Sequence, residues 1–432
     1  MTPFEKSQPS GPNSARMDRR AVLRLGGAGL IGCSLAASPL ITPVTFASAP
    51  WENRLVVIIL RGAMDGVDAL RPVGDADYRA MRGGAAQKGV RLGGGFFALH
   101  PALAPLHPLW QAGELGFAHA ISTPYRDKRS HFDGQDLLEA GTDMDAAGQL
   151  RDGWLNRLLQ SVPAAEAETG FAIGRGDMRI LAGKAPVANW APDSALQLDP
   201  QTFDLAERIM HDDPLFRDAL GEAAELSGLD LAALRDGEAG MGAGMGAATD
   251  AGEMLSAMQE QMRGARTGTG HLELARFAAA RLTGASRIAA FSLGGWDTHA
   301  QQDRRIGAPL ARLSDAVLAL KEGLGPVWGK TCVLAMTEFG RTVRLNGSGG
   351  TDHGTGGAML MAGGALRGGR VWADWPGLSE DALYARRDLM PTRDVRAYAA
   401  WAMRGLFGLP QQVLEHSVFP GVEMGADPRL LL

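Results

Sequence analysis

Two apolar runs, RIAAFSL at residues 287–293 and TCVLAMT at residues 331–337, decide the fold that this sequence predicts. Each is long enough for one buried strand, and each stops abruptly, the first at two glycines and the second at Glu338. Between them, apolar residues recur at helical spacing from Leu310 to Leu324, which predicts an amphipathic helix. A strand, a crossover helix and a second strand form a βαβ unit, so the sequence predicts a parallel sheet.

Further apolar runs extend this sheet. RLVVIIL at residues 54–60 is rich in β-branched residues, which is typical of a strand buried on both faces and hence central. Together with the intervening helices, these runs predict an α/β protein with a mostly parallel central sheet. The other expected strands are residues 115–121, 171–173, 179–181, 358–362 and 370–373.

The composition is that of a globular protein of 432 residues, 45% hydrophobic and 21% charged. The formal net charge is -5, and a net-acidic chain lacks the basic surface that a nucleic-acid binder needs. The two cysteines are Cys33 and Cys332. Because Cys33 lies in the leader predicted below, the mature chain keeps a single thiol and forms no internal disulfide.

Residues 1–49 predict a secretory leader. Arg19 and Arg20 precede a weakly apolar run that ends at Leu40, and a small-residue cleavage site, Ala-Ser-Ala, follows at residues 47–49. Paired arginines ahead of a mild apolar core resemble a twin-arginine signal, which directs folded proteins to the twin-arginine translocase. We therefore expect export to the periplasm or beyond, with no membrane span in the mature chain. Lipid attachment at Cys33 is the alternative.

The mature chain, residues 50–432, is predicted to form a single domain with one insertion. Residues 201–283 are helical in pattern and rich in alanine and methionine. A glycine-rich segment interrupts them and has too few apolar side chains to bury. This insertion is predicted to form a helical cap beside the sheet.

Acidic, imidazole and hydroxyl side chains follow the predicted strands. Sites in open α/β sheets form beyond the carboxyl ends of strands, and Asp, Glu and His gathered there suit a divalent metal or acid/base chemistry. Simpler interpretations stay open, because an aspartate before a glycine forms a turn and a serine at a helix start is a favoured cap. Arg341 either clamps an anion or pairs with Glu338. The candidates are Asp65, Ser130, His131, Asp297, His299, Glu338, Arg341, Asp352 and His353.

Five short motifs carry a resemblance to a known family. They are RGAMDG at 61–66, SHF at 130–132, GWDTH at 295–299, TEFGRT at 337–342 and DHG at 352–354. The whole mature chain resembles a family of exported bacterial proteins catalogued only as a domain of unknown function, number fifteen hundred and one. At the level of the fold, that family is similar to the alkaline phosphatase superfamily of phosphatases, sulfatases and phosphoglycerate mutases.

This resemblance implies a three-layer α/β sandwich and assigns roles to particular residues. Asp65 resembles the metal ligand after the first strand, and Ser130 takes the place of the nucleophile at a helix start. The resemblance also gives Asp297 and His299 the place of a ligand pair, and His353 that of a later ligand. Glu338 stands where many members carry an Asp-His pair, so the number of metals stays open.

Two functions follow as hypotheses. The first is a hydrolase of phosphate or sulfate esters that uses a divalent metal (Zn, Mn, Ca or Mg) and acts on a small anionic ester or a glycan. The second is a non-catalytic protein that keeps the fold and binds a glycan or a secreted partner. For the first, the predicted metal ligands are Asp65, Asp297, His299, Asp352 and His353, and the predicted catalytic residues are Ser130, His131, Glu338 and Arg341.

Overall fold

The computed structural model describes residues 51–83, 88–144, 152–162, 170–173, 178–190 and 270–432. All of them belong to one of the two units into which the chain divides, Val44–Leu432. The predicted leader, residues 1–49, lies outside the described residues, and so do residues 201–269 of the predicted cap.

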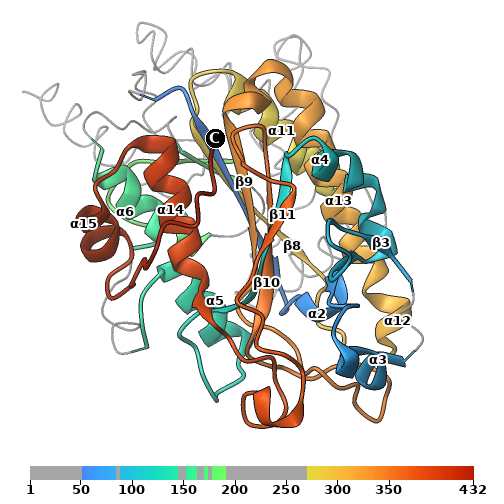
Figure 1. Cartoon of the computed structure of the whole chain (residues 1–432). Helices are drawn as coiled ribbons and strands as arrows, with labels where there is room; N and C mark the ends of the chain where they lie inside the picture. Colours follow the sequence, from blue (N-terminus) through green and yellow to red (C-terminus); the bar gives the residue numbers. More distant parts are fainter. Residues whose placement is uncertain (1–50, 84–87, 145–151, 163–169, 174–177, 191–269) are drawn as a thin grey trace, which may run out of the picture. The chain divides into compact units, whose positions relative to one another are not determined.

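A mostly parallel sheet forms the centre of the described part (Figure 1). The strand β10 runs antiparallel to both of its neighbours, and the other pairs within this sheet are parallel. In spatial order the strands are β11 (Arg370–Trp372), β5 (Leu115–Ser122), β10 (Gly357–Ala362), β9 (Thr331–Met336), β1 (Arg54–Arg61), β8 (Ile288–Gly294), β6 (Gly170–Ile173) and β7 (Ala188–Trp190); β12 (Arg393–Asp394) also pairs with β5.

The first strand, β1, is central, as its β-branched sequence predicts. Side chains alternate between the two faces of a strand. The odd-numbered residues from Leu55 to Ile59 enter one apolar cluster, and the even-numbered residues from Val56 to Leu60 enter another. All six side chains are fully buried, so both faces of the sheet are covered.

Helices cover the sheet on both sides (Figure 1). One side carries α5 (His131–Ala140), α6 (Trp154–Gln160) and α14 (Val395–Phe407); the other carries α4 (His107–Gln111), α11 (Gly270–Thr283) and α13 (Gly307–Leu324). The α/β prediction is confirmed. The crossover prediction is confirmed too, because α13 connects β8 to β9 and these strands lie on either side of β1. In the described part of the chain, no helix is both long and apolar enough to cross a bilayer.

Shorter elements complete the described part. Residues 179–181, expected as a strand, form the 3-10 helix η4 (Arg179–Leu181) instead, because Leu181 donates its backbone N–H to Met178 within the turn. A small sheet contains β2 (Leu70–Arg71), β4 (Ala98–Leu99) and β3 (Val90–Arg91). The remaining elements are α2 (Gly66–Ala69), α3 (Ala76–Arg82), η2 (Pro101–Leu106), α12 (Gln302–Arg305), η5 (Gly325–Lys330), η6 (Glu380–Ala382), α15 (Gln411–Val413) and the π-helix η7 (Leu414–Val418).

The reversed strand explains how distant segments meet. The parallel strands β1, β8, β9 and β5 all end at one edge of the sheet. Because β10 runs the opposite way, it begins at that same edge, and the loop before it lies there too. The loops that carry Asp297, Glu338 and His353 therefore converge.

Candidate metal centre

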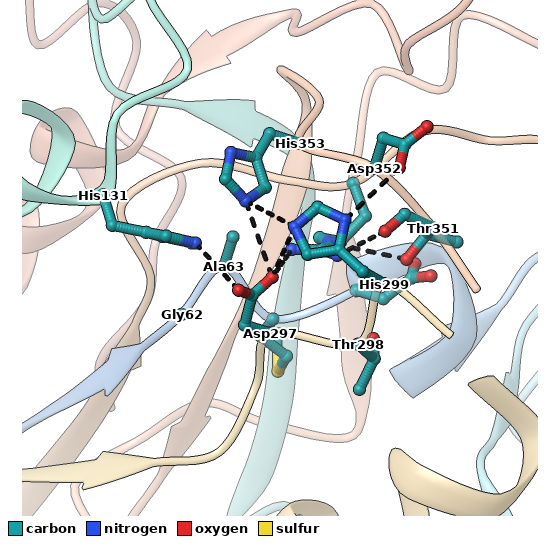
Figure 2. A network of polar contacts seen from close by, with 12 residues as sticks. Gly62, Ala63, His131, Asp297, Thr298, His299, Thr351, Asp352 and His353 are labelled. Atoms are coloured by element: carbon teal, nitrogen blue, oxygen red, sulfur yellow. Dashed lines mark hydrogen bonds and ion pairs between the residues drawn. The ribbon is translucent and has the colours of Figure 1, made fainter. Parts of the chain in front are cut away.

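Three side chains from three segments meet at the carboxyl edge of the sheet (Figure 2). They are His131, the first residue of α5; Asp297, just after β8; and His353, just before β10. One nitrogen of each histidine and one carboxylate oxygen lie within 4.8 Å of one another. Two imidazoles and a carboxylate are a common ligand set for transition metals.

Hydrogen bonds on the far side of each imidazole fix which nitrogen faces the cluster. Nδ1 of His353 donates to the carbonyl oxygen of Arg129 at 2.8 Å, and Nδ1 of His131 donates to Oε1 of Glu338 at 2.8 Å. Both Nε2 atoms therefore face Asp297, at 3.5 Å from its Oδ1 in the case of His353 and from its Oδ2 in the case of His131. Metal-binding histidines in proteins are held by the same kind of contact on the other nitrogen.

The structure itself tests whether a cation fits. Nε2 of His131 is buried and, within the described part of the protein, has no hydrogen-bond partner. A buried polar atom without a partner is energetically costly, and a cation beside Asp297 would satisfy it. The hydrogen bond to Glu338 raises the pKa of His131, so a proton competes with a cation for this nitrogen.

Asp297 is held by a buried arginine. Nη1 of Arg341 donates to Oδ1 of Asp297 at 2.7 Å. Burial would raise the pKa of Asp297, but the hydrogen bond and charge of Arg341 outweigh it and lower the pKa. The carboxylate is therefore held in its ionised form. Of the two roles considered for Arg341, pairing with Glu338 is wrong, because Arg341 pairs with Asp297 and other donors bind Glu338.

Those donors come from two segments, the turn after β1 and the helix α5. Oε1 of Glu338 accepts hydrogen bonds from the backbone N–H of Gly62 at 2.9 Å and of Ala63 at 3.0 Å, from Nδ1 of His131, and from Nε2 of Gln135 at 3.2 Å. Glu338 is fully buried. Burial would raise its pKa, but the hydrogen bonds, led by that of His131, hold it below its usual value.

His299 borders the cluster on its exposed side. Its Nε2 lies 3.0 Å from Oδ1 of Asp297 and 3.0 Å from Nε2 of His353. Its Nδ1 lies 3.3 Å from Oδ1 of Asp352, which also accepts a hydrogen bond from Asn346 at 3.0 Å. The Asn346 hydrogen bond is the main cause of a lowered pKa of Asp352. Asp352 thus contacts His299 and is not one of the three clustered residues (Figure 2).

Asp65 does not join the three clustered residues. Its Oδ2 pairs with Nη1 of Arg82 at 2.7 Å and accepts a hydrogen bond from Gln302 at 2.8 Å. Its Oδ1 caps α2 by accepting the backbone N–H of Asp68 at 3.1 Å. Both members of the ion pair are fully buried. The predicted ligand is thus a helix cap whose charge a buried guanidinium neutralises.

Ser130 caps α5, next to His131 in the chain. Its hydroxyl accepts the backbone N–H of Asp133 at 3.4 Å, and its own N–H donates to the hydroxyl of Tyr125 at 2.7 Å. The preceding loop contacts the cluster through its backbone, because the Arg129 carbonyl accepts from His353. Lys128 and Arg129 are both exposed in this loop.

Sequence reasoning missed several residues that hold the site. Gln135 and Ala63 contact Glu338, yet neither has a distinctive sequence signal. Gly62 had one, because it is a glycine directly after a predicted strand. In the structure its φ is +115°, which favours glycine. A Cβ atom at Gly62 would lie 2.9 Å from the backbone nitrogen of Asp297, so only glycine allows this close approach.

Comparisons with known proteins identify the family of this chain. No curated protein matches the chain. Similar solved structures include a protein of the alkaline phosphatase superfamily from Vibrio parahaemolyticus, at 12% identity and a TM-score of 0.32, covering 81% of this chain and 69% of that one. A second is the C-terminal periplasmic domain of EcEptC from Escherichia coli, at 9% identity and a TM-score of 0.36, covering 90% of this chain and 96% of that one. A third is a mutant of TAB5 alkaline phosphatase with bound Mg, at 11% identity and a TM-score of 0.31, covering 73% of this chain and 92% of that one. These likenesses are too weak to carry an argument about this chain's chemistry. The family model is different: it matches residues 118–398, well over half of the chain, and the protein therefore belongs to the family described as a protein of unknown function (DUF1501).

Proposed function

We propose that this protein is a metal-dependent hydrolase of phosphate or sulfate esters, and that His131, Asp297 and His353 hold the divalent cation. One observation supports this most directly. The buried Nε2 of His131 has no hydrogen-bond partner in the described structure and lies 3.5 Å from a carboxylate oxygen of Asp297. A cation bound between these two groups would give this nitrogen a partner.

The donor set favours some cations over others. Calcium and magnesium prefer all-oxygen sites, whereas two imidazoles with one carboxylate suit zinc, manganese or iron. A cation held there would polarise the ester and make a nearby hydroxyl or water a stronger nucleophile. Zinc and manganese are therefore the first cations to test.

The chain's own residues contribute charge and position. Arg341 keeps Asp297 ionised through the 2.7 Å contact, and the carbonyl of Arg129 holds His353. Lys128 and Arg129 are exposed in the loop whose Arg129 carbonyl contacts His353, and we propose that their cationic side chains favour an anionic substrate. These features favour an ester of phosphate or sulfate over a neutral ester.

Cation content and ester turnover test the proposal together. We expect protein purified without chelators to contain zinc or manganese and to hydrolyse 4-nitrophenyl phosphate or 4-nitrophenyl sulfate. His131→Ala and His353→Ala should each lose the cation and the turnover. The matched control is His416→Ala, at an exposed histidine in η7, which should keep both.

Two results would count against the proposal. Wild-type protein that binds no divalent cation would remove its basis. Protein that binds the cation but cleaves neither ester would favour the non-catalytic alternative, in which the site binds a glycan or a secreted partner. Among active variants, Ser130→Ala identifies the nucleophile: lost turnover points to the Ser130 hydroxyl, and retained turnover points to water.

Export through the twin-arginine translocase is part of the same proposal. It depends on Arg19 and Arg20, and replacing both with lysine should leave the protein in the cytoplasm, whereas Arg24→Lys in the same leader should not. Export of the double variant would argue against this route. A lipid label on the wild type that Cys33→Ser abolishes would instead favour attachment at Cys33.

A further inference from the structure

Glu338 connects three segments that are far apart in the sequence. It follows β9, and its Oε1 accepts from Gly62 and Ala63 after β1 and from His131 and Gln135 on α5. The residue is fully buried, so a substrate entering from solvent does not reach its carboxylate. A carboxylate placed in this way acts on its neighbours rather than on a ligand.

The first neighbour is His131. A neutral imidazole carries one hydrogen, and its position depends on which nitrogen has an acceptor. Because Glu338 accepts at Nδ1 at 2.8 Å, the hydrogen lies there and the lone pair of Nε2 faces Asp297. Without this contact, either nitrogen of His131 would be free to carry the hydrogen.

The second neighbour is the turn at Gly62 and Ala63. Both residues have positive φ, +115° and +59°, a backbone region that residues other than glycine seldom adopt. Glu338 accepts the N–H groups of both. Gly62 lies directly against the backbone of Asp297, where a Cβ would be 2.9 Å from the Asp297 nitrogen. Holding this turn therefore also holds the backbone of Asp297.

We infer that Glu338 is a positioning residue that fixes two of the three members of the cation site, His131 through its ring hydrogen and Asp297 through the Gly62–Ala63 turn. This replaces the catalytic role expected for Glu338 from the sequence. The inference rests on the proposed function, because positioning matters only if the site binds a cation. The contacts of Glu338 with His131 and with the Gly62–Ala63 turn, however, are those of the protein without a cation.

The first experiment reads the hydrogen position on His131 directly. Nitrogen-15 NMR of metal-free wild-type protein in alkaline buffer distinguishes the two neutral forms, and comparison with His131→Gln assigns the signal among the nine histidines. We expect the form with hydrogen on Nδ1. The form with hydrogen on Nε2 would overturn the inference. This measurement needs neither a cation nor a folded Glu338 variant.

The second experiment measures cation affinity by calorimetry with zinc and with manganese. Glu338→Gln keeps the size of the side chain but removes its charge, and we expect binding to weaken about 10- to 100-fold, the usual loss when such a supporting group is changed. The matched control is Glu114→Gln. Glu114 directly precedes β5, at the edge of the sheet opposite the cation site, and its carboxylate accepts from Lys321 and Trp328. This variant should bind like the wild type.

The outcomes distinguish the positioning role of Glu338 from the proposed function. Equal affinity of Glu338→Gln and wild type, with an unchanged His131 signal, would overturn the inference and leave the cation site standing. A wild type that binds neither cation would overturn the proposed function, while the NMR result would still decide which nitrogen of His131 carries the hydrogen, as the contact with Glu338 predicts.

Discussion

Asp65→Asn separates a structural role of Asp65 from a role as a metal ligand. The structure pairs Asp65 with Arg82 at 2.7 Å, and neither side chain reaches solvent. Asparagine keeps the shape but removes the charge, so the Arg82 guanidinium would stay buried without its counterion. Two backbone carbonyls, of Val343 and Thr342, would still accept from Arg82. We expect a clear loss of stability and little change in cation binding.

The size of the loss follows from the burial. Removing one partner of a buried ion pair destabilises a protein by about 3–5 kcal/mol. An unfolding entropy of about 2.1 cal/mol/K per residue gives roughly 0.9 kcal/mol/K for a chain of 432 residues. The melting temperature should therefore fall by roughly 3–6 °C.

A matched variant tests the reasoning about burial. Asp394 also caps a helix, α14, and pairs with an arginine, Arg396, at 2.7 Å, but it is partly exposed. Asp394→Asn should therefore cost less than Asp65→Asn in calorimetric melting. A purely structural role for Asp65 would be refuted if Asp65→Asn melted like the wild type and bound zinc at least about tenfold more weakly, the loss expected when a group that supports a metal is changed.

Other predictions concern the core and the loop before β10. Burial lowers the pKa of His119 to about 4, so His119 is neutral in the folded protein. Because the unfolded chain binds a proton at this residue near pH 6.5, the free energy of unfolding should fall by up to about 3 kcal/mol as the pH drops from about 6.5 to about 4. Acid titrations of His119→Gln should show a smaller loss over this range. Burial raises the pKa of the Cys332 thiol to about 12, so iodoacetamide should label Cys332 only after unfolding, as mass spectrometry would show. A Cβ at Gly350 would lie 2.1 Å from the carbonyl carbon of His299, so Gly350→Ala should lower the melting temperature and displace His299. In the same loop Gly347→Ala should not, since no atom lies within 4 Å of its Cβ position; equal melting of the two variants would contradict this.

The strands and the crossover helix were predictable because their signal is local. Each strand of the central part is a short apolar run, and α13 repeats its apolar residues at helical spacing. The direction of β10 was not predictable in this way. Its six residues, Gly357–Ala362, are all buried like those of a parallel strand. Its reversal follows from the path of the preceding loop, which stays at the carboxyl edge of the sheet.

The members of the site were easier to predict than their grouping. Asp65, Asp297 and His353 were all candidates, since each follows or precedes a strand at the same edge. Only the last two meet His131, because Asp65 is taken up by contacts away from the cluster. Asp65 pairs with Arg82 at the end of α3, and no spacing in the sequence signals a contact between these two residues.

Two buried arginines therefore determine what kind of site is left. Arg82 neutralises Asp65 away from the cluster, and Arg341 takes one oxygen of Asp297 within it. A fixed positive charge bonded to the only carboxylate of the cluster repels a second cation at that oxygen. The proposed site takes one ligand atom from each of His131, Asp297 and His353. In the proposed site, a cation bound by three protein atoms would keep open positions for a substrate. The two arginines thus favour a site for a single cation, in which Glu338 positions His131 and Asp297.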